Sequence, residues 1–327
     1  MTPRERFIAA LERKPIIGHV PHFELVFYLT MEAIGKVHPI HRHYVQWEQM
    51  SETERKLQRE DIADCYLEIA RRYQHDAIFF HPFEGATEPE THRLLETLRA
   101  RGGDQYFVMM HGDATFSIPD GNHMMDFVAN AYMNPESTKA EAERMVDAQL
   151  LRAERLEKSR LLDGFALCSD YCFNSGPFLS PEVFYELITP YLTRLTTGLR
   201  KMGFYVIKHT DGNIMPILDQ LISTKPHALH SLDPQGHVDI AEVKRRYGDQ
   251  VCLIGNVHCG MLSTGTKAEI EASARYALEC GMPGGGYIFS TSNCVFTGMP
   301  LINYETMWHV WRDEGVYATE STPEVSL

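Results

Sequence analysis

The sequence has no long apolar run: uninterrupted stretches such as residues 77–80 are far too short to cross a bilayer. No apolar segment follows the basic residues near the amino terminus, so no secretory signal is predicted. No low-complexity tract precedes residues 319–327, and we expect those residues to form a flexible tail. A membrane is therefore not an expected partner.

Positive charge is also scarce. The chain carries 31 Lys and Arg against 44 Asp and Glu, a formal charge of −13, whereas binding to nucleic acid needs clustered basic side chains. The seven cysteines are an odd number spread over 327 residues, which fits free thiols in a reducing compartment better than a disulfide framework. Nucleic acid is thus not an expected partner, and the expected location is cytoplasmic.

What the sequence does contain is an alternation of strand-like and helix-like segments. Capping boxes at Thr2–Glu5, Ser51–Glu54 and Thr138–Glu141 predict the starts of three helices, the first at the amino terminus and the last a long one. Ser180 and the following proline predict a helix that runs to about Lys201. Strands are predicted at residues 20–28, 77–83, 106–114, 164–171, 205–210, 228–232, 251–257 and 287–291.

Strands separated by helices pair in parallel through right-handed crossovers. Eight such units in a chain of this length predict an α/β fold, a single (β/α)₈ TIM barrel over residues 1–318 with an amino-terminal helical extension. A doubly wound open sheet is the alternative, but no G-x-G-x-x-G follows the first predicted strand, so its dinucleotide-binding form has no support.

Polar residues stand at the predicted carboxyl ends of these strands, where a barrel of this kind holds its active site. The sharpest pair is His209 and Asp211, because alternate residues of a strand point the same way. This pair could ligate zinc, hydrogen-bond a substrate, or simply brace the turn at Gly212. If a metal is bound, His258 and Cys294 at the ends of strands seven and eight are the further candidate ligands.

The segment after the fourth strand mixes carboxylate, amide and aromatic groups, which suits a small aromatic or amphipathic ligand. Asp170 is the candidate catalytic group there, together with His209 and Asp211. The remaining candidates for substrate binding also lie at predicted strand ends or in this segment: Glu24, His81, Glu84, His111, Tyr171, Phe173, Asn174 and Asn256.

Several motifs resemble the uroporphyrinogen decarboxylase-like superfamily, in the right order over about residues 165–317. They are Asp170–Phe178 with Leu179–Glu182, His209–Asn213 with Pro216–Asp219, His237–Ile240 through Lys244–Asp249, Gly255–Val257, and Gly284–Ile288 with Ser290. The resemblance implies a (β/α)₈ barrel. It also implies one of two activities, decarboxylation of a porphyrinogen without a cofactor or methyl transfer to a corrinoid, generally with zinc.

The chain departs from the decarboxylases of that superfamily. Residues 21–25 stand where those enzymes carry an arginine-rich stretch, and residues 80–83 stand where they carry an acidic residue for the pyrrole nitrogens. With few basic groups to bind substrate carboxylates, the decarboxylase alternative is disfavoured. In the thiol-methylating branch a His-x-Cys motif binds zinc, and Asp211 replaces that cysteine here.

Fewer thiolates would leave zinc more electrophilic, which suits activation of an ether oxygen. The resemblance therefore implies an O-demethylating methyltransferase that passes the methyl group of a methoxylated, aromatic substrate to the corrinoid of a separate protein. The alternatives are a cofactor-independent decarboxylase and a non-catalytic protein that binds a corrinoid or tetrapyrrole. The sequence leaves the oligomeric state open, and a homodimer is kept as a hypothesis.

Overall fold

A computed structural model gives the structure of the protein, and residues 1–317 of it are described; the predicted tail at residues 319–327 lies outside them. Seven parallel strands form one curled sheet in the order β10-β9-β8-β7-β4-β3-β2. Their bounds are β2 Ala77–Phe79, β3 Phe107–His111, β4 Gly164–Cys168, β7 Tyr205–His209, β8 Ala228–Ser231, β9 Cys252–Val257 and β10 Tyr287–Thr291. The fold is the predicted α/β, TIM-barrel-like one.

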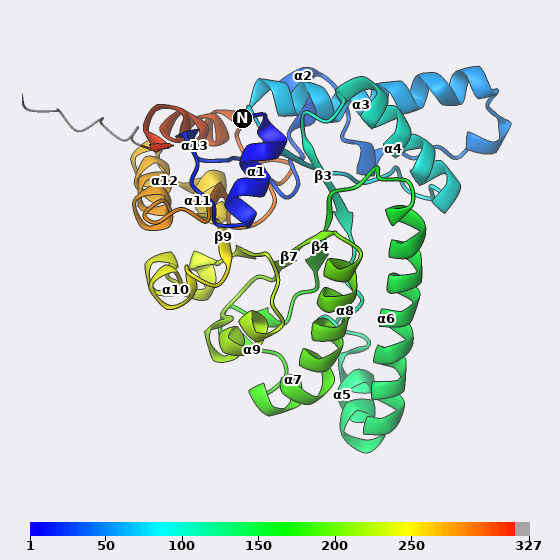
Figure 1. Ribbon diagram of the computed structural model, residues 1–327, viewed down its shortest axis with the longest axis vertical. Helices are drawn as coiled ribbons and strands as arrows, with labels where there is room; N and C mark the ends of the chain where they lie inside the picture. Colours follow the sequence, from blue (N-terminus) through cyan, green and yellow to red (C-terminus); the bar gives the residue numbers. More distant parts are fainter. Residues whose placement is uncertain (318–327) are drawn as a thin grey trace, which may run out of the picture.

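Helices surround the strands, as Figure 1 shows. The longer ones are α1 (Pro3–Leu11), α3 (Glu52–Arg72), α4 (Glu88–Gly102), α5 (Met124–Met133), α6 (Pro135–Glu157), α8 (Thr189–Lys201), α10 (Ile240–Tyr247), α12 (Lys267–Gly281) and α13 (Leu301–Glu314). Shorter ones are α2 (Thr30–Ile34), α7 (Pro181–Leu187), α9 (Leu218–Ser223) and α11 (Cys259–Thr264). No helix among residues 1–317 is long and apolar enough to cross a membrane.

The eighth strand position is filled by an irregular segment, so the prediction of a strand at residues 20–28 is wrong. Only isolated bridges form there, from His22 to Phe289 and from Phe27 to Val295. Pro21 has no N–H to donate, and the N–H of His22 is bonded to the Asp76 carboxylate at 2.8 Å. The segment still lies between β10 and β2, because the Phe289 N–H donates to the Pro21 carbonyl and the Asp76 N–H to the His22 carbonyl.

Two apolar cores hold the layers together. The inner one fills the barrel, with Ile207 of β7 and Ile254 of β9 fully buried in it. Helix α1 closes the amino-terminal end of the barrel, where the Phe7 ring lies 4.8 Å from Phe107 and 5.3 Å from Phe23 between centroids. The second core packs the strands against the surrounding helices. Since Ile207 faces the barrel interior, alternation places His209 on the same inner side of β7.

Two predicted helices differ from the structure, one in where it begins and one in its continuity. Thr138 lies inside α6, which begins at Pro135, and its hydroxyl bonds the Asn134 carbonyl one turn back. The predicted helix from Ser180 to Lys201 is split at Ile188 into α7 and α8, because Pro190 has no N–H for a continuous helix. The capping boxes at Thr2 and Ser51 are present as predicted.

Candidate functional site

Three potential metal-ligating side chains meet at the carboxyl end of β4 and β7. One ligand atom from each of Asp170, His209 and Asp211 lies within 4.8 Å of the others. His209 Nε2 is 3.6 Å from Asp211 Oδ1 and 3.9 Å from Asp170 Oδ1. The His209 side chain is almost completely buried, whereas that of Asp170 is 49% exposed, so the group opens to solvent on the side of Asp170.

A second layer of polar side chains orients this group. The sheet register places His209 beside His230 of β8, and their Nδ1 atoms are 2.7 Å apart. Asp211 Oδ1 accepts a hydrogen bond of 2.7 Å from the Ser231 hydroxyl, and Asp211 Oδ2 accepts one from the Asn293 amide. Burial raises the pKa of Asp211, and the neighbouring Asp170 and Asp233 act in the same direction.

A buried ion pair supports the segment that carries Asp170. Lys208 points away from the barrel interior, and its Nζ lies 2.8 Å from Asp113 Oδ2 with both side chains essentially unexposed. The same ammonium donates to the Ser169 carbonyl at 3.0 Å and lies 4.2 Å from the centre of the Tyr171 ring. Lys208 therefore fixes the residues on both sides of Asp170.

Close backbone approach completes the arrangement. Gly212, at φ +78°, has a backbone that other residues rarely adopt, and a Cβ there would lie 2.6 Å from the Cys172 carbonyl oxygen. The absence of a side chain lets the hairpin of β5 (Cys172–Phe173) and β6 (Gly176–Pro177) lie directly against the turn after Asp211.

The donor set fits a divalent metal ion such as zinc. In a tetrahedral zinc site with bonds near 2.1 Å, neighbouring ligand atoms are about 3.4 Å apart, close to the two separations measured from His209 Nε2. The Nδ1 hydrogen bond to His230 and the two donors on Asp211 are the kind of outer contacts that orient metal ligands. His209 and both aspartates would thus hold the ion.

Comparison with known proteins places the chain in a family. The sequence model of the family described as Uroporphyrinogen decarboxylase (URO-D) matches residues 120–313, more than half of the chain and all three members of the group. The chain belongs to the URO-D family. This confirms the resemblance on which the sequence prediction rested.

Two individual proteins illustrate the likeness. A curated uroporphyrinogen decarboxylase of Thioalkalivibrio sulfidiphilus is 29% identical over 134 residues, which are 38% of this chain and 35% of that protein. A solved structure titled methyltransferase from Methanosarcina mazei superposes with a TM-score of 0.73 at 16% identity, covering 96% of this chain and 99% of that one. The second match supports the fold. The aligned part of the curated relative is only about a third of its length.

The structure does not bring His258 and Cys294 into the three-residue group. His258 caps α11, and its Nδ1 accepts a hydrogen bond of 3.3 Å from the Met261 N–H. Cys294 lies in the loop after β10. Burial is the main cause that raises the pKa of its thiol, and the nearby Cys259 and Asp211 raise it further. Among residues 1–317, the group within ligand distance instead contains Asp170, which the sequence indicated as a catalytic residue.

The residues after Asp170 have different environments in this URO-D protein. Tyr171 is buried, with its hydroxyl 2.6 Å from Thr115 Oγ1, so it serves the Lys208 support rather than an open surface. Phe173 is 45% exposed on the β5–β6 hairpin, and Asn174 is exposed at the turn. The hairpin can thus offer Phe173 and Asn174 to a ligand beside Asp170.

The second and third strand ends place histidines near the same opening. His81 Nδ1 is buried without a hydrogen-bond partner, and burial lowers the pKa of His81 to about 4. His111 is exposed, although desolvation by the protein atoms around its ring lowers its pKa. Glu84 is instead an exposed surface residue that forms an ion pair with His43 at 2.6 Å. Of the two histidines, His111 is therefore the one whose side chain is open to a ligand, whereas the unpartnered nitrogen of His81 is buried.

The Asn256 side chain bonds the protein backbone rather than facing the three-residue group. Its amide donates a hydrogen bond of 2.9 Å to the Leu232 carbonyl. Together with His258 and Tyr276 it lines a hollow of about 300 Å³ beside α12. The amide therefore holds the loop after β8, and the predicted substrate contact stays a prediction without support from this geometry.

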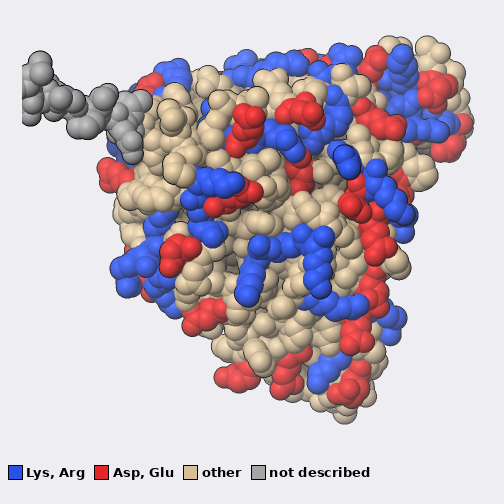
Figure 2. Space-filling view, in the orientation of Figure 1, with Lys and Arg blue, Asp and Glu red and all other residues tan. Residues whose placement is uncertain are grey.

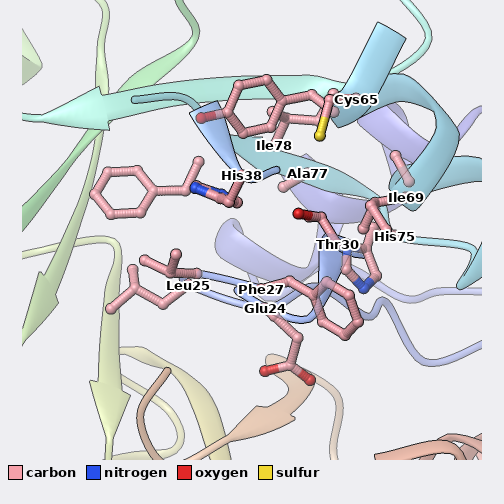
Figure 3. Close-up of a pocket in the computed structure, with 14 residues that line it drawn as sticks. Glu24, Leu25, Phe27, Thr30, His38, Cys65, Ile69, His75, Ala77 and Ile78 are labelled. Atoms are coloured by element: carbon pink, nitrogen blue, oxygen red, sulfur yellow. The ribbon is translucent and has the colours of Figure 1, made fainter. Parts of the chain in front are cut away.

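Glu24 is buried and points toward β10. Its Oε2 accepts hydrogen bonds from the Thr291 N–H at 3.1 Å and from the Ser290 hydroxyl at 3.2 Å, whereas Oε1 has no partner. Figure 3 shows that this carboxylate turns away from Thr30 and His38, which line the same small cavity of about 30 Å³. Glu24 thus belongs to the buried network rather than to an open substrate surface.

Sequence reasoning assigned no role to His230, Ser290 or Lys208. His230 and Ser290 stand at predicted strand ends, but only the closed sheet shows that they lie side by side. The signal for Lys208 was available, because a lysine in a predicted buried strand, directly after the apolar residues 204–207, must be paired when buried.

A larger hollow lies at the opposite end of the barrel. It measures about 790 Å³ and is lined by residues that precede the strands, among them Arg13, Arg200 and Lys225. Figure 2 shows Lys and Arg side chains gathered near the centre of this face. Catalytic residues of TIM barrels lie at the carboxyl ends of the strands, so this hollow is not the candidate active site.

The buried Glu24 predicts a specific pH dependence of stability. Burial raises its pKa to about 8, from 4.5 for a free side chain. The folded protein therefore keeps a proton that the unfolded chain releases, and the free energy of unfolding should fall as pH rises from about 4.5 to about 8, by at most about 1.4 kcal/mol per unit. In Glu24→Gln, which mimics the neutral acid, the decline should be smaller by the share that Glu24 contributes, whereas Asp76, whose pKa burial raises to about 7, keeps its own share. Urea unfolding of both proteins across that range checks it, and parallel curves would contradict the assignment.

Proposed function

We propose that this URO-D family protein is a metal-dependent methyltransferase that moves a methyl group from a methoxylated, aromatic substrate to the corrinoid of a separate protein. The observation that carries the proposal is the group of Asp170, His209 and Asp211, in which a buried imidazole nitrogen faces two carboxylates. A histidine and carboxylates in this position are acceptable ligands for zinc.

A bound zinc ion would supply Lewis acidity at an ether oxygen. In the reaction, the bond between methyl carbon and oxygen breaks, and the methyl group forms a bond to the reduced cobalt of the corrinoid substrate. The electron pair of the broken bond stays on the leaving oxygen, which takes a proton from water. Solvent reaches the group on the side of the half-exposed Asp170, while the buried His209 and the partly buried, hydrogen-bonded Asp211 keep their orientation.

The substrate would lie between the opening and the β5–β6 hairpin. Phe173 offers an exposed ring for an aromatic substrate, and His111 offers ring nitrogens for its polar substituents. A decarboxylase of a porphyrinogen is the second candidate, which family membership favours. Against it, Asp170 and Asp211 would repel substrate carboxylates, and Lys208 is already paired with Asp113.

The test compares two reactions of the same preparation, purified without chelators. We expect about one zinc ion per chain, formation of methylated corrinoid from a methoxylated aromatic compound and a reduced corrinoid protein, and no carbon dioxide from uroporphyrinogen III. Release of carbon dioxide well above background would contradict the proposal. So would tight binding of a tetrapyrrole or corrinoid with neither reaction.

A further inference from the structure

We propose that the hollow at the amino-terminal end of the barrel binds a small organic molecule with two or more negative charges, a phosphate ester or a polycarboxylate. Three cationic side chains from different parts of the chain line it. Arg13 follows α1, Arg200 lies in the last turn of α8, and Lys225 follows α9. The inference concerns the end of the barrel opposite Asp170 and does not depend on the proposed methyl transfer.

The hollow has the size of a small-molecule site. Its volume of about 790 Å³ lies within the range of about 300–1,000 Å³ that is usual for pockets that hold organic ligands. Part of its wall is apolar and includes the buried side chains of Leu11, Ile222 and Val251. A bare inorganic anion would leave most of this space, and the apolar wall, to water. We therefore expect the ligand to have an organic body.

The acidic side chains in the same lining are already paired with other groups. Glu12 forms an ion pair with Lys14 and accepts a hydrogen bond of 2.7 Å from the Tyr205 hydroxyl. An Asp219 oxygen lies 3.0 Å from Arg246 Nη2. Neither carboxylate is thus left to neutralise the three cations of the hollow.

Two of the cations are held by contacts that leave their charge uncompensated. Arg200 Nη1 donates a hydrogen bond of 2.6 Å to the Lys225 carbonyl, which uses only one N–H of the guanidinium. The stem of Arg13 lies against Gly286, where a Cβ would be 2.8 Å from Arg13 Cγ. Among residues 1–317, no carboxylate forms an ion pair with Arg13, Arg200 or Lys225. Since the formal charge of the chain is −13, an anion would be attracted to this hollow rather than to the surface in general.

A neutral hydrogen-bond donor lies in the same lining. His227 Nδ1 accepts the Val206 N–H at 2.9 Å, and a backbone N–H can only donate. Burial is the main cause that lowers the pKa of His227 to about 4, and the charge of Arg200 lowers it further. The ring is therefore neutral at pH 7 and carries its one hydrogen on Nε2. Among residues 1–317 no group accepts that hydrogen, so it is available to an oxygen of the ligand.

These donors suit phosphate and carboxylate oxygens alike. A guanidinium offers two N–H groups at the spacing of two oxygens, and an ammonium adds a compact charge. The alternative is that the cations only stabilise the carboxyl ends of α1, α8 and α9, where positive charge is favourable. That role needs neither a hollow nor the unused donor of His227, and it predicts that no anion binds.

Isothermal titration calorimetry of the full chain with three probes tests the site: adenosine triphosphate, citrate and pyrophosphate, at about 0.15 M salt, where distant charges are screened. We expect one molecule of an organic probe per chain, bound more tightly than pyrophosphate, which has no organic body. The tighter of adenosine triphosphate and citrate shows whether the ligand is a phosphate ester or a polycarboxylate. Absence of binding by all three probes at millimolar concentration would overturn the inference, as would pyrophosphate binding as tightly as both organic probes.

Variants locate the binding. Arg200→Gln and Lys225→Asn each remove one charge, and asparagine tolerates the left-handed backbone of position 225, where φ is +58°. We expect each variant to bind the organic probe at least about tenfold more weakly. Arg200→Lys keeps the charge and should keep most of the affinity. Lys201→Gln is the matched control, because Lys201 is exposed on the same helix but does not line the hollow. An equal loss in Lys201→Gln and Arg200→Gln would overturn the assignment to the hollow.

Chelation of zinc by the probes cannot imitate this result. The variants leave Asp170, His209 and Asp211 unchanged, so chelation would give the same signal in all of them, and only the difference between variants reports on the hollow. Failure of this inference is also distinct from failure of the proposed function. A protein that binds the organic probe but transfers no methyl group refutes only the proposed function, and one that transfers methyl groups but binds no probe refutes only this inference.

Discussion

Replacing His209 with alanine is expected to remove the bound metal and, with it, methyl transfer. His209 supplies the only nitrogen of the three-residue group, so its loss should weaken zinc binding by more than the roughly 10- to 100-fold that loss of an outer contact costs. Metal analysis of the purified variant, together with zinc titration by calorimetry, measures the effect. A metal content equal to that of the natural protein would refute the role of His209.

Two control variants decide between ligand sets. His258→Asn removes an imidazole that the sequence indicated as a ligand but keeps a side chain that can cap α11. Cys294→Ala removes the candidate thiolate. Because the structure groups neither residue with His209, both variants should retain zinc. Loss of zinc in either one would show that the sequence-based ligand set was the better one.

Asp170→Ala should lower turnover by roughly 10²-fold or more while the protein stays folded. The carboxylate belongs to the three-residue group and lies at its open side, where the proposed substrate would enter. Its side chain is 49% exposed and accepts a hydrogen bond of 3.0 Å from the Asp211 N–H, so the cost in stability should be only about 1 kcal/mol. Turnover and melting temperature are measured on the same preparation.

The alternative is that Asp170 only holds the backbone of Asp211 in place. Asp170→Asn separates the two roles, because an amide oxygen can still accept from the Asp211 N–H but carries no charge. We expect Asp170→Asn to be as stable as the natural protein and nearly as inactive as Asp170→Ala. A variant that is destabilised yet active would rule out the catalytic role.

The sequence was sufficient to predict most of the barrel, because buried parallel strands and capped helices leave local signals. Seven of the eight expected strands are present, and a helix begins at Ser51 as its capping box indicates. The first strand was overpredicted because the four apolar residues among 23–27 are buried whether or not they join a ladder. Whether these residues join a ladder depends on Pro21 and on the Asp76 carboxylate, which binds the His22 N–H from 54 positions further along the chain.

The site was predicted in part for a similar reason. The spacing of His209 and Asp211 along one strand is local information, and it correctly indicated that the two side chains lie together. Which further groups join them depends on the neighbours that the closed sheet creates. His230 and Asp170 come from the strands on either side of His209, whereas Cys294 and His258 follow β10 and β9, which are not its neighbours in the sheet.

The irregular segment at residues 20–27 makes one seam of the barrel weaker than the others. Elsewhere neighbouring strands share continuous ladders, but between β10 and β2 closure depends on a few separate backbone bonds, such as Phe289 N–H to Pro21 and Asp76 N–H to His22. Partial opening of a folded protein starts where few bonds must break. The amide hydrogens along this seam should therefore exchange with solvent before those of β7. Glu24 would detach from Thr291 in such an opening while Asp170, His209 and Asp211 remained on intact strands.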